Sequence, residues 1–133
     1  MKRRQWAIGW LMAAPIALLI AGCSSPSTSL MGTDVTSVAG MADIRATDVA
    51  TTGDRLIRGR FTLHGPCEDA GVAMERASDR MLQRGWTRQG IDADDTHAVA
   101  TFVKDDRTCR IEIRRHPEDP SRSTATIEVD SAM

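Results

Sequence analysis

Aromatic residues are scarce in this sequence. Its 133 residues include no Tyr, two Phe and three Trp, and 17 basic residues face 18 acidic ones. Proteins that bind single-stranded nucleic acid stack the bases on aromatic side chains, and nucleic-acid-binding domains usually carry a basic excess. This chain has neither property, so we expect no nucleic-acid partner.

Sequence motifs of catalysis are also missing. The chain has no GxSxG nucleophile elbow, no HExxH zinc motif and no glycine-rich phosphate loop. A length of 133 residues allows one ordinary domain and excludes a large multidomain enzyme. We therefore predict a protein that is not an enzyme, with no catalytic residues and no cofactor.

The amino terminus has the features of an export signal. Lys2, Arg3 and Arg4 form a basic start, and residues 6–22 contain no charged side chain. A basic head before a short apolar stretch is typical of a signal peptide, whereas a membrane-spanning helix needs about 20 apolar residues. Pro15 also interrupts this stretch as a helix. We predict that residues 1–22 are a signal peptide.

The sequence Ile20-Ala21-Gly22-Cys23 resembles the lipobox of bacterial lipoproteins. This resemblance implies cleavage before Cys23 and lipidation of Cys23, which attaches the protein to a membrane through several acyl chains. Ser24 stands where lipoproteins retained in the inner membrane often have Asp, so the resemblance implies the outer membrane, facing the periplasm. The alternative is an uncleaved anchor or an ordinary signal peptide with a chance cysteine.

The remainder of the chain divides at residue 54. Residues 23–54 are rich in Ser, Thr, Gly, Ala and Asp, which is typical of a flexible linker. We predict a lipidated flexible tether over residues 23–54 and a small domain over residues 55–133. An alternative interpretation rests on four apolar residues spaced by three, which would line a short helix or a docking segment that orders on a partner: Val35, Val38, Met41 and Ile44.

One amphipathic helix is predicted over residues 67–84. Its apolar residues recur at helical spacing, at Ala70, Ala73, Met74, Ala77 and Met81. Gly85 is suited to end the helix in a left-handed conformation, and Trp86 can supply the apolar contact that accompanies such an end.

Strands are predicted where apolar and polar residues alternate, at residues 55–64, 86–91, 97–104, 108–115 and 122–130. In the first of these, we expect Ile57, Phe61 and Leu63 to face the core and Gly59 to mark a bulge or a close approach. The order is β-α-β-β-β-β. We predict the α+β class, with a single helix packed on an antiparallel sheet of four to five strands.

Two cysteines remain after Cys23. Export would place Cys67 and Cys109 in an oxidising compartment, and both are expected on the apolar side, so we predict a disulfide between them. The alternatives are a zinc site completed by His64 and His116, or a redox-active Cys67 at the start of the helix.

Carboxylates gather in a predicted turn at Asp92, Asp94 and Asp95. Calcium loops of the EF-hand type use such residues, but this stretch lacks their glycine and closing glutamate. We therefore interpret it as a hairpin tip and predict no metal site.

Arginines are expected to share the outer face of the sheet, where Glu112 and Glu128 lie between them. We predict a binding surface for an acidic partner, peptidoglycan or anionic head groups, at Arg58, Arg60, Arg110 and Arg114, with Arg115 nearby. The alternative is a solvated face with cross-strand ion pairs of small energetic value.

The stretch from Met81 to Thr87, with the acidic turn and strand after it, resembles helix-plus-sheet domains of small envelope lipoproteins. These include accessory subunits of outer-membrane protein assembly, and the resemblance implies an architecture only. We predict a lipid-anchored, periplasm-facing envelope lipoprotein that is a non-enzymatic binding or assembly accessory module with an envelope protein partner. The alternative is a periplasmic sensor lipoprotein that binds a small ligand or a metal.

Overall fold

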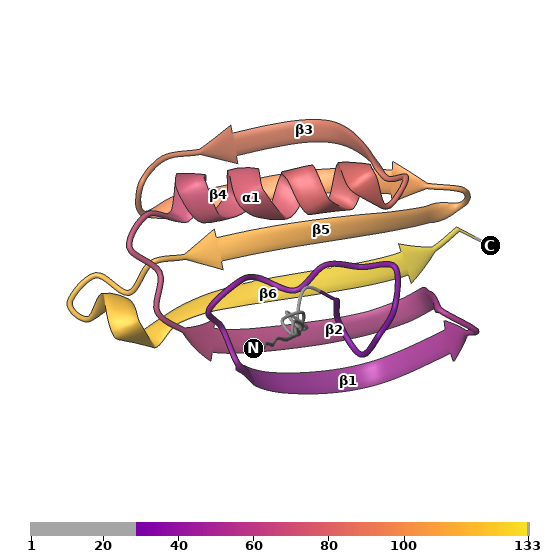
Figure 1. Cartoon of the computed structure of the whole chain (residues 1–133), viewed down its shortest axis with the longest axis horizontal. Helices are drawn as coiled ribbons and strands as arrows, with labels where there is room; N and C mark the ends of the chain where they lie inside the picture. Colours follow the sequence, from indigo (N-terminus) through magenta and orange to yellow (C-terminus); the bar gives the residue numbers. More distant parts are fainter. Residues whose placement is uncertain (1–28, 133) are drawn as a thin grey trace, which may run out of the picture.

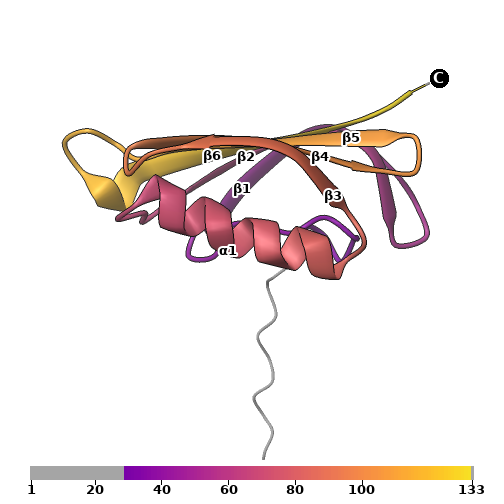
Figure 2. The same ribbon diagram turned by 90° about the horizontal axis from the view of Figure 1, so that it is seen from above.

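A computed structural model describes residues 29–132. They form one antiparallel sheet, and one layer of other elements covers one side of this sheet (Figures 1 and 2). The strand order across the sheet is β1-β2-β6-β5-β4-β3. The α+β class with one helix is confirmed, but the sheet has six strands. The elements are β1 (Asp43–Thr52), β2 (Arg55–Gly65), α1 (Ala70–Gln83), β3 (Thr87–Ala93), β4 (His97–Lys104), β5 (Arg107–Arg114), the short 3-10 helix η3 (Pro120–Arg122) and β6 (Ser123–Ser131).

The sixth strand and part of the core come from the segment expected to be a flexible tether. β1 lies within it, and four of its apolar residues are at most 3% exposed: Leu30, Val35, Val38 and Met41. The prediction of a tether over residues 23–54 is therefore wrong from residue 29 onward, and the domain begins well before residue 55. The helix alternative is also wrong, because residues 29–42 form no helix and Ile44 is 43% exposed.

The packing of α1 explains why this segment is ordered. The helix lies against β3, β4 and β5, so this helix does not cover the same side of β2 and β6. Residues 29–42 cross this area, as both views show (Figures 1 and 2). Because an uncovered apolar sheet face costs roughly 25 cal/mol per Å², the segment that covers it becomes part of the folded domain.

A buried ion pair fastens this segment to the sheet. The fully buried guanidinium of Arg107 donates to Asp34 Oδ1 and Oδ2 at 3.1 and 2.8 Å and to the carbonyl of Leu56 at 2.9 Å. The ring of Trp86 lies 4.8 Å from this guanidinium, and its Nε1 donates to the carbonyl of Asp34 at 2.8 Å. Lys104 Nζ adds a bond to Asp34 Oδ2 at 3.2 Å.

The ionisation of Asp34 reflects these contacts. Burial acts to raise its pKa, but hydrogen bonds from Arg107, Leu56 N and Lys104 outweigh burial and lower the pKa to about 2. The Asp34 carboxylate is thus charged across the ordinary pH range.

Both ends of the observed helix α1 lie within three residues of the predicted ends, 67 and 84. Asp69 caps the helix, since its Oδ1 accepts from Val72 N at 3.0 Å, so the helix begins at Ala70 and not at residue 67. At the other end, Gly85 has φ +91°, and Trp86 N donates to the carbonyl of Met81 at 3.1 Å. The expected left-handed end and its buried tryptophan are both confirmed.

The inward face of β2 differs from the prediction at one position. Phe61 and Leu63 are buried as expected, but Leu56 is fully buried and Ile57 is only partly so. The pairing of β1 with β2 shifts register here, which moves the side chains by one position. Gly59 marks a close approach, because a Cβ at this residue would lie 2.8 Å from the ring of Phe61.

Cys67 and Cys109 are both buried free thiols, so the predicted disulfide is wrong. Cys67 N donates to the carbonyl of Pro120, at the η3 end of the sheet, whereas Cys109 pairs with Val129 near the other end of β6. The intervening length of β6, from Ser123 to Val129, corresponds to about 20 Å of extended chain. A disulfide requires Cα atoms within about 7 Å, so facing the same layer does not bring these thiols together.

Candidate functional site

The candidate site is the side of the sheet opposite α1, which we call the open face. Figure 2 shows the helix and residues 29–42 on one side of the sheet only. Cross-strand partners share a face, so the register gives the composition of its rows. One row runs from β1 to β4 through Thr47, Arg60, Glu128, Arg110 and Thr101.

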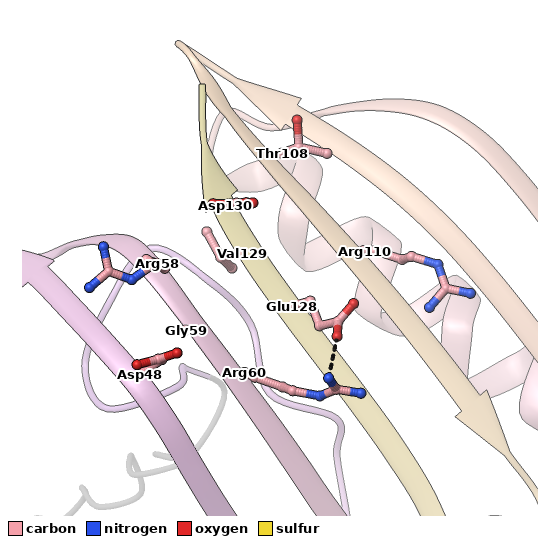
Figure 3. Close-up of a pocket in the computed structure, with 9 residues that line it drawn as sticks. All are labelled: Asp48, Arg58, Gly59, Arg60, Thr108, Arg110, Glu128, Val129 and Asp130. Atoms are coloured by element: carbon pink, nitrogen blue, oxygen red, sulfur yellow. Dashed lines mark ion pairs between the residues drawn. The ribbon is translucent and has the colours of Figure 1, made fainter. Parts of the chain in front are cut away.

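Three of the four predicted arginines line one cavity on the open face. Arg58, Arg60 and Arg110 surround a space of about 380 Å³ (Figure 3). Three carboxylates share its lining, so the charges balance: Asp48, Glu128 and Asp130. In Figure 3 the side chains of Arg60 and Glu128 point toward each other, and Arg60 Nη1 lies 3.2 Å from Glu128 Oε2.

The backbone of the first hairpin sets the position of these groups. Gly59 faces inward over Phe61, so the flanking Arg58 and Arg60 both face outward. Asp48 lies at the irregularity of β1 with φ +58°, a left-handed conformation that Asp tolerates better than most residues. The interruption of pairing at Asp48 thus lies at the rim of the cavity.

Glu112 connects the cavity to the next part of the open face. Its Oε2 lies 2.6 Å from His97 Nε2 and 2.8 Å from Arg114 Nη2, and its Oε1 lies 3.4 Å from Arg110 Nη1. The hydrogen bond with His97, together with the charges of Arg114 and Arg110, lowers the pKa of Glu112. The carboxylate therefore carries a stable negative charge among three basic side chains.

Arg114 does not join the other three predicted arginines. It lines a different cavity, at the η3 end of the sheet, together with His97 and Arg115. The open face thus has two distinct polar regions, and the sequence prediction had treated them as one.

The comparisons with known proteins identify no relative. No family model, curated protein or solved structure matches this chain. The candidate site is therefore argued from its own residues.

The structure also bears on the metal and redox alternatives. Within residues 29–132, no three His, Cys, Asp or Glu side chains are grouped so that they could hold a metal ion. Asp94 instead orders its turn, since its Oδ1 accepts from Thr96 N and His97 N, both at 2.9 Å. Burial raises the pKa of the Cys67 thiol, which opposes the thiolate form that redox chemistry needs.

The predicted lipid site Cys23 and the predicted signal peptide, residues 1–22, lie outside the described residues. In residues 29–132, no helix has the length and apolar character needed to cross a membrane.

The sequence-based prediction assigned no role to three charged residues that fasten residues 29–42 to the sheet: Asp34, Lys104 and Arg107. Asp34 lies in the segment taken as a tether, directly before the apolar residues spaced by three but not one of them. The buried position of Arg107 was predictable, because Arg107 lies two and four residues before the inward-facing Cys109 and Ile111 of the same strand. The alternation of β5 therefore placed an arginine on the core side.

Proposed function

We propose that this protein is a lipid-anchored, periplasm-facing envelope lipoprotein of the outer membrane, and that it is a non-enzymatic binding or assembly module. The observation that carries the proposal is the open face. Within residues 29–132, the elements that cover the six-stranded sheet all lie on one side of it, and the other side presents arginines, carboxylates and threonines.

The charge pattern of the open face favours a protein as the partner. Arg58, Arg60 and Arg110 alternate with an equal number of carboxylates around one cavity. A uniformly anionic membrane surface or polymer would be attracted by a basic excess, and this region has none. A protein surface with both signs of charge can match such a pattern and gain specificity from it.

The start of the ordered domain supports this arrangement. Cys23 precedes Ser29 by only a few residues, a span of at most about 20 Å. Ser29 Oγ accepts a hydrogen bond from Arg84, at the end of α1, at 2.9 Å. A lipid at Cys23 would therefore join the chain near the helix end, away from the open face, and would hold the domain close to the bilayer.

Site-specific photocrosslinking in intact cells tests the partner. A photoreactive residue at position 58 or 110 is expected to crosslink to one discrete protein, whereas the same residue at the exposed helix position Arg76 is the matched control. The double substitution Arg60→Glu with Glu128→Arg keeps their ion pair but reverses its direction, and should abolish the crosslink. The absence of a discrete product, or equal products from position 76, would overturn the proposed surface.

The lipid anchor has its own test. Cys23→Ser is expected to move the protein from the membrane fraction to the soluble periplasmic fraction, and intact mass should show acyl chains on the wild-type Cys23. An unmodified Cys23 would exclude the lipid anchor. The crosslinking experiment would still test the binding surface on its own.

A further inference from the structure

A basic groove lies at the η3 end of the sheet, where β2 ends and β6 begins. Two cavities of about 460 and 470 Å³ share His116, Arg122 and Thr124 in their linings, so they adjoin at these residues and together make up the basic groove. Each volume is in the range of small-ligand sites. His97, Arg114, Thr124 and His64 follow one another in a cross-strand row from β4 to β2 at this groove.

The lining of the basic groove has one sign of charge. Arg114, Arg115 and Arg122 contribute guanidinium groups, and three histidines add imidazoles. None of the residues that line the two cavities, all in the described part of the chain, has a carboxylate. The cavity around Arg60 differs in this respect, since three carboxylates balance its three arginines.

The carboxylates nearest to the groove leave part of its charge uncompensated. Glu112 pairs with Arg114 at 2.8 Å, but Asp95 reaches Arg115 only at 3.9 Å. The side chain of Arg122 makes no ion pair within residues 29–132. Hydrogen bonds from Ser121 to Oδ1 of the nearby Asp119 and, to a smaller extent, the charge of Arg122 lower the pKa of that carboxyl. Two arginines of the groove thus have only distant carboxylate partners.

Hydrogen-bond donors remain at the groove. His116 Nδ1 accepts from Glu118 N at 3.2 Å and from Asp119 N at 3.0 Å, so the neutral ring carries its proton on Nε2. The Nε2 donor of His116, with the two guanidinium groups, suits an anion that has several acceptor oxygens.

We propose that the basic groove binds the phosphate group of a small dissolved molecule, held by Arg115, Arg122 and His116. Guanidinium groups match phosphate oxygens in pairs and form strong charge-assisted hydrogen bonds with them. A phosphate dianion needs more than one cation, and the groove supplies two arginines whose carboxylate partners, Asp95 and Asp119, lie outside its lining. This site is separate from the open-face cavity and does not depend on the partner proposed for that cavity.

Calorimetric titration of the full chain in phosphatidylcholine nanodiscs with inorganic phosphate tests the proposal, at constant ionic strength with chloride as the balancing anion. Saturable binding is expected. Arg122→Gln should weaken it about tenfold or more, as expected for the loss of a charge-assisted pair. The matched control Arg76→Gln, at an exposed position of α1, should change the affinity less than twofold. Arg115→Gln provides a second variant, and amide NMR spectra show whether each variant remains folded.

A second arm distinguishes a dissolved ligand from a lipid head group. Part of the phosphatidylcholine is replaced by phosphatidic acid, whose head group is a phosphate monoester. An unchanged affinity for inorganic phosphate supports the dissolved ligand. A loss of affinity that depends on Arg122 would assign the groove to the head group and overturn the proposal. Absence of saturable binding, or equal weakening by Arg76→Gln and Arg122→Gln, would also overturn it.

Discussion

Loss of one partner from the pair formed by Asp34 and Arg107 should strongly destabilise this domain. Replacing Asp34 by Asn removes the carboxylate charge and leaves the guanidinium of Arg107 fully buried. Removal of one partner from a buried ion pair typically costs 3–5 kcal/mol. Arg107 keeps the Leu56 carbonyl and a bond to Asp105 at 3.3 Å, so we expect the lower end of this range, about 3 kcal/mol.

The pKa of Asp34 gives an independent magnitude. Its decrease from 3.8 to about 2 corresponds to roughly 2.5 kcal/mol, at 1.36 kcal/mol per pKa unit. Because the pKa is lower in the folded state, this stabilisation is present above pH 3.8 and is lost as the pH falls through about 2. The difference in stability between wild type and Asp34→Asn should therefore shrink as the pH falls from about 4 to about 2.

Urea unfolding of the fragment Ser24–Met133, which contains every described element, measures this difference. Hydrogen exchange should also show faster exchange at the amides of residues 30–41, since the ion pair fastens that segment. The matched control is Arg55→Gln, which breaks an exposed pair with Asp105 and should cost less than about 1 kcal/mol. A cost below 1 kcal/mol for Asp34→Asn at pH 7, or one that is constant down to pH 2, would refute the reasoning.

Two further predictions concern close packing and the thiols. Gly59→Ala should lower the free energy of unfolding by about 1–3 kcal/mol, because its Cβ would lie 2.8 Å from the Phe61 ring, whereas Gly90→Ala, with nothing within 4 Å, should have a much smaller effect in the same urea assay. Cys67 and Cys109 should both react with a thiol reagent once the protein is denatured without reductant, and reductant should leave the melting temperature unchanged; a mass lower by two hydrogens would contradict the free thiols.

The elements from residue 55 onward could be predicted because their signals are local. The β4 prediction, residues 97–104, matches the observed strand, and α1 was located by the spacing of its apolar residues and by Gly85. β1 was not predicted, because it is an edge strand and every one of its residues is exposed or only partly buried. Without a buried face, a strand has no alternation of apolar and polar residues to detect.

The candidate site was predictable in part for a related reason. Alternation assigned Arg58, Arg60 and Arg110 to the outer face, which the structure places around one cavity. Alternation does not give the position of a residue along the strand direction of the sheet. That position separates Arg114 from the other three arginines, and it also separates Cys67 from Cys109. Register depends on pairing between distant strands, which no local pattern encodes.

The central position of β6 has a consequence for how the chain acquires its fold. This strand is the last of the described strands in the chain, yet it lies between β2 and β5 and joins the first hairpin to the other three strands. Before β6 is in place, the hairpin β1–β2 and the strands β3–β5 have no strand that pairs with both of them. Folding is therefore delayed until nearly the whole chain is present, as is general for non-local β pairing. An exported chain, as this one is proposed to be, gains from that delay where it crosses the membrane unfolded, because a partly delivered chain cannot close its sheet.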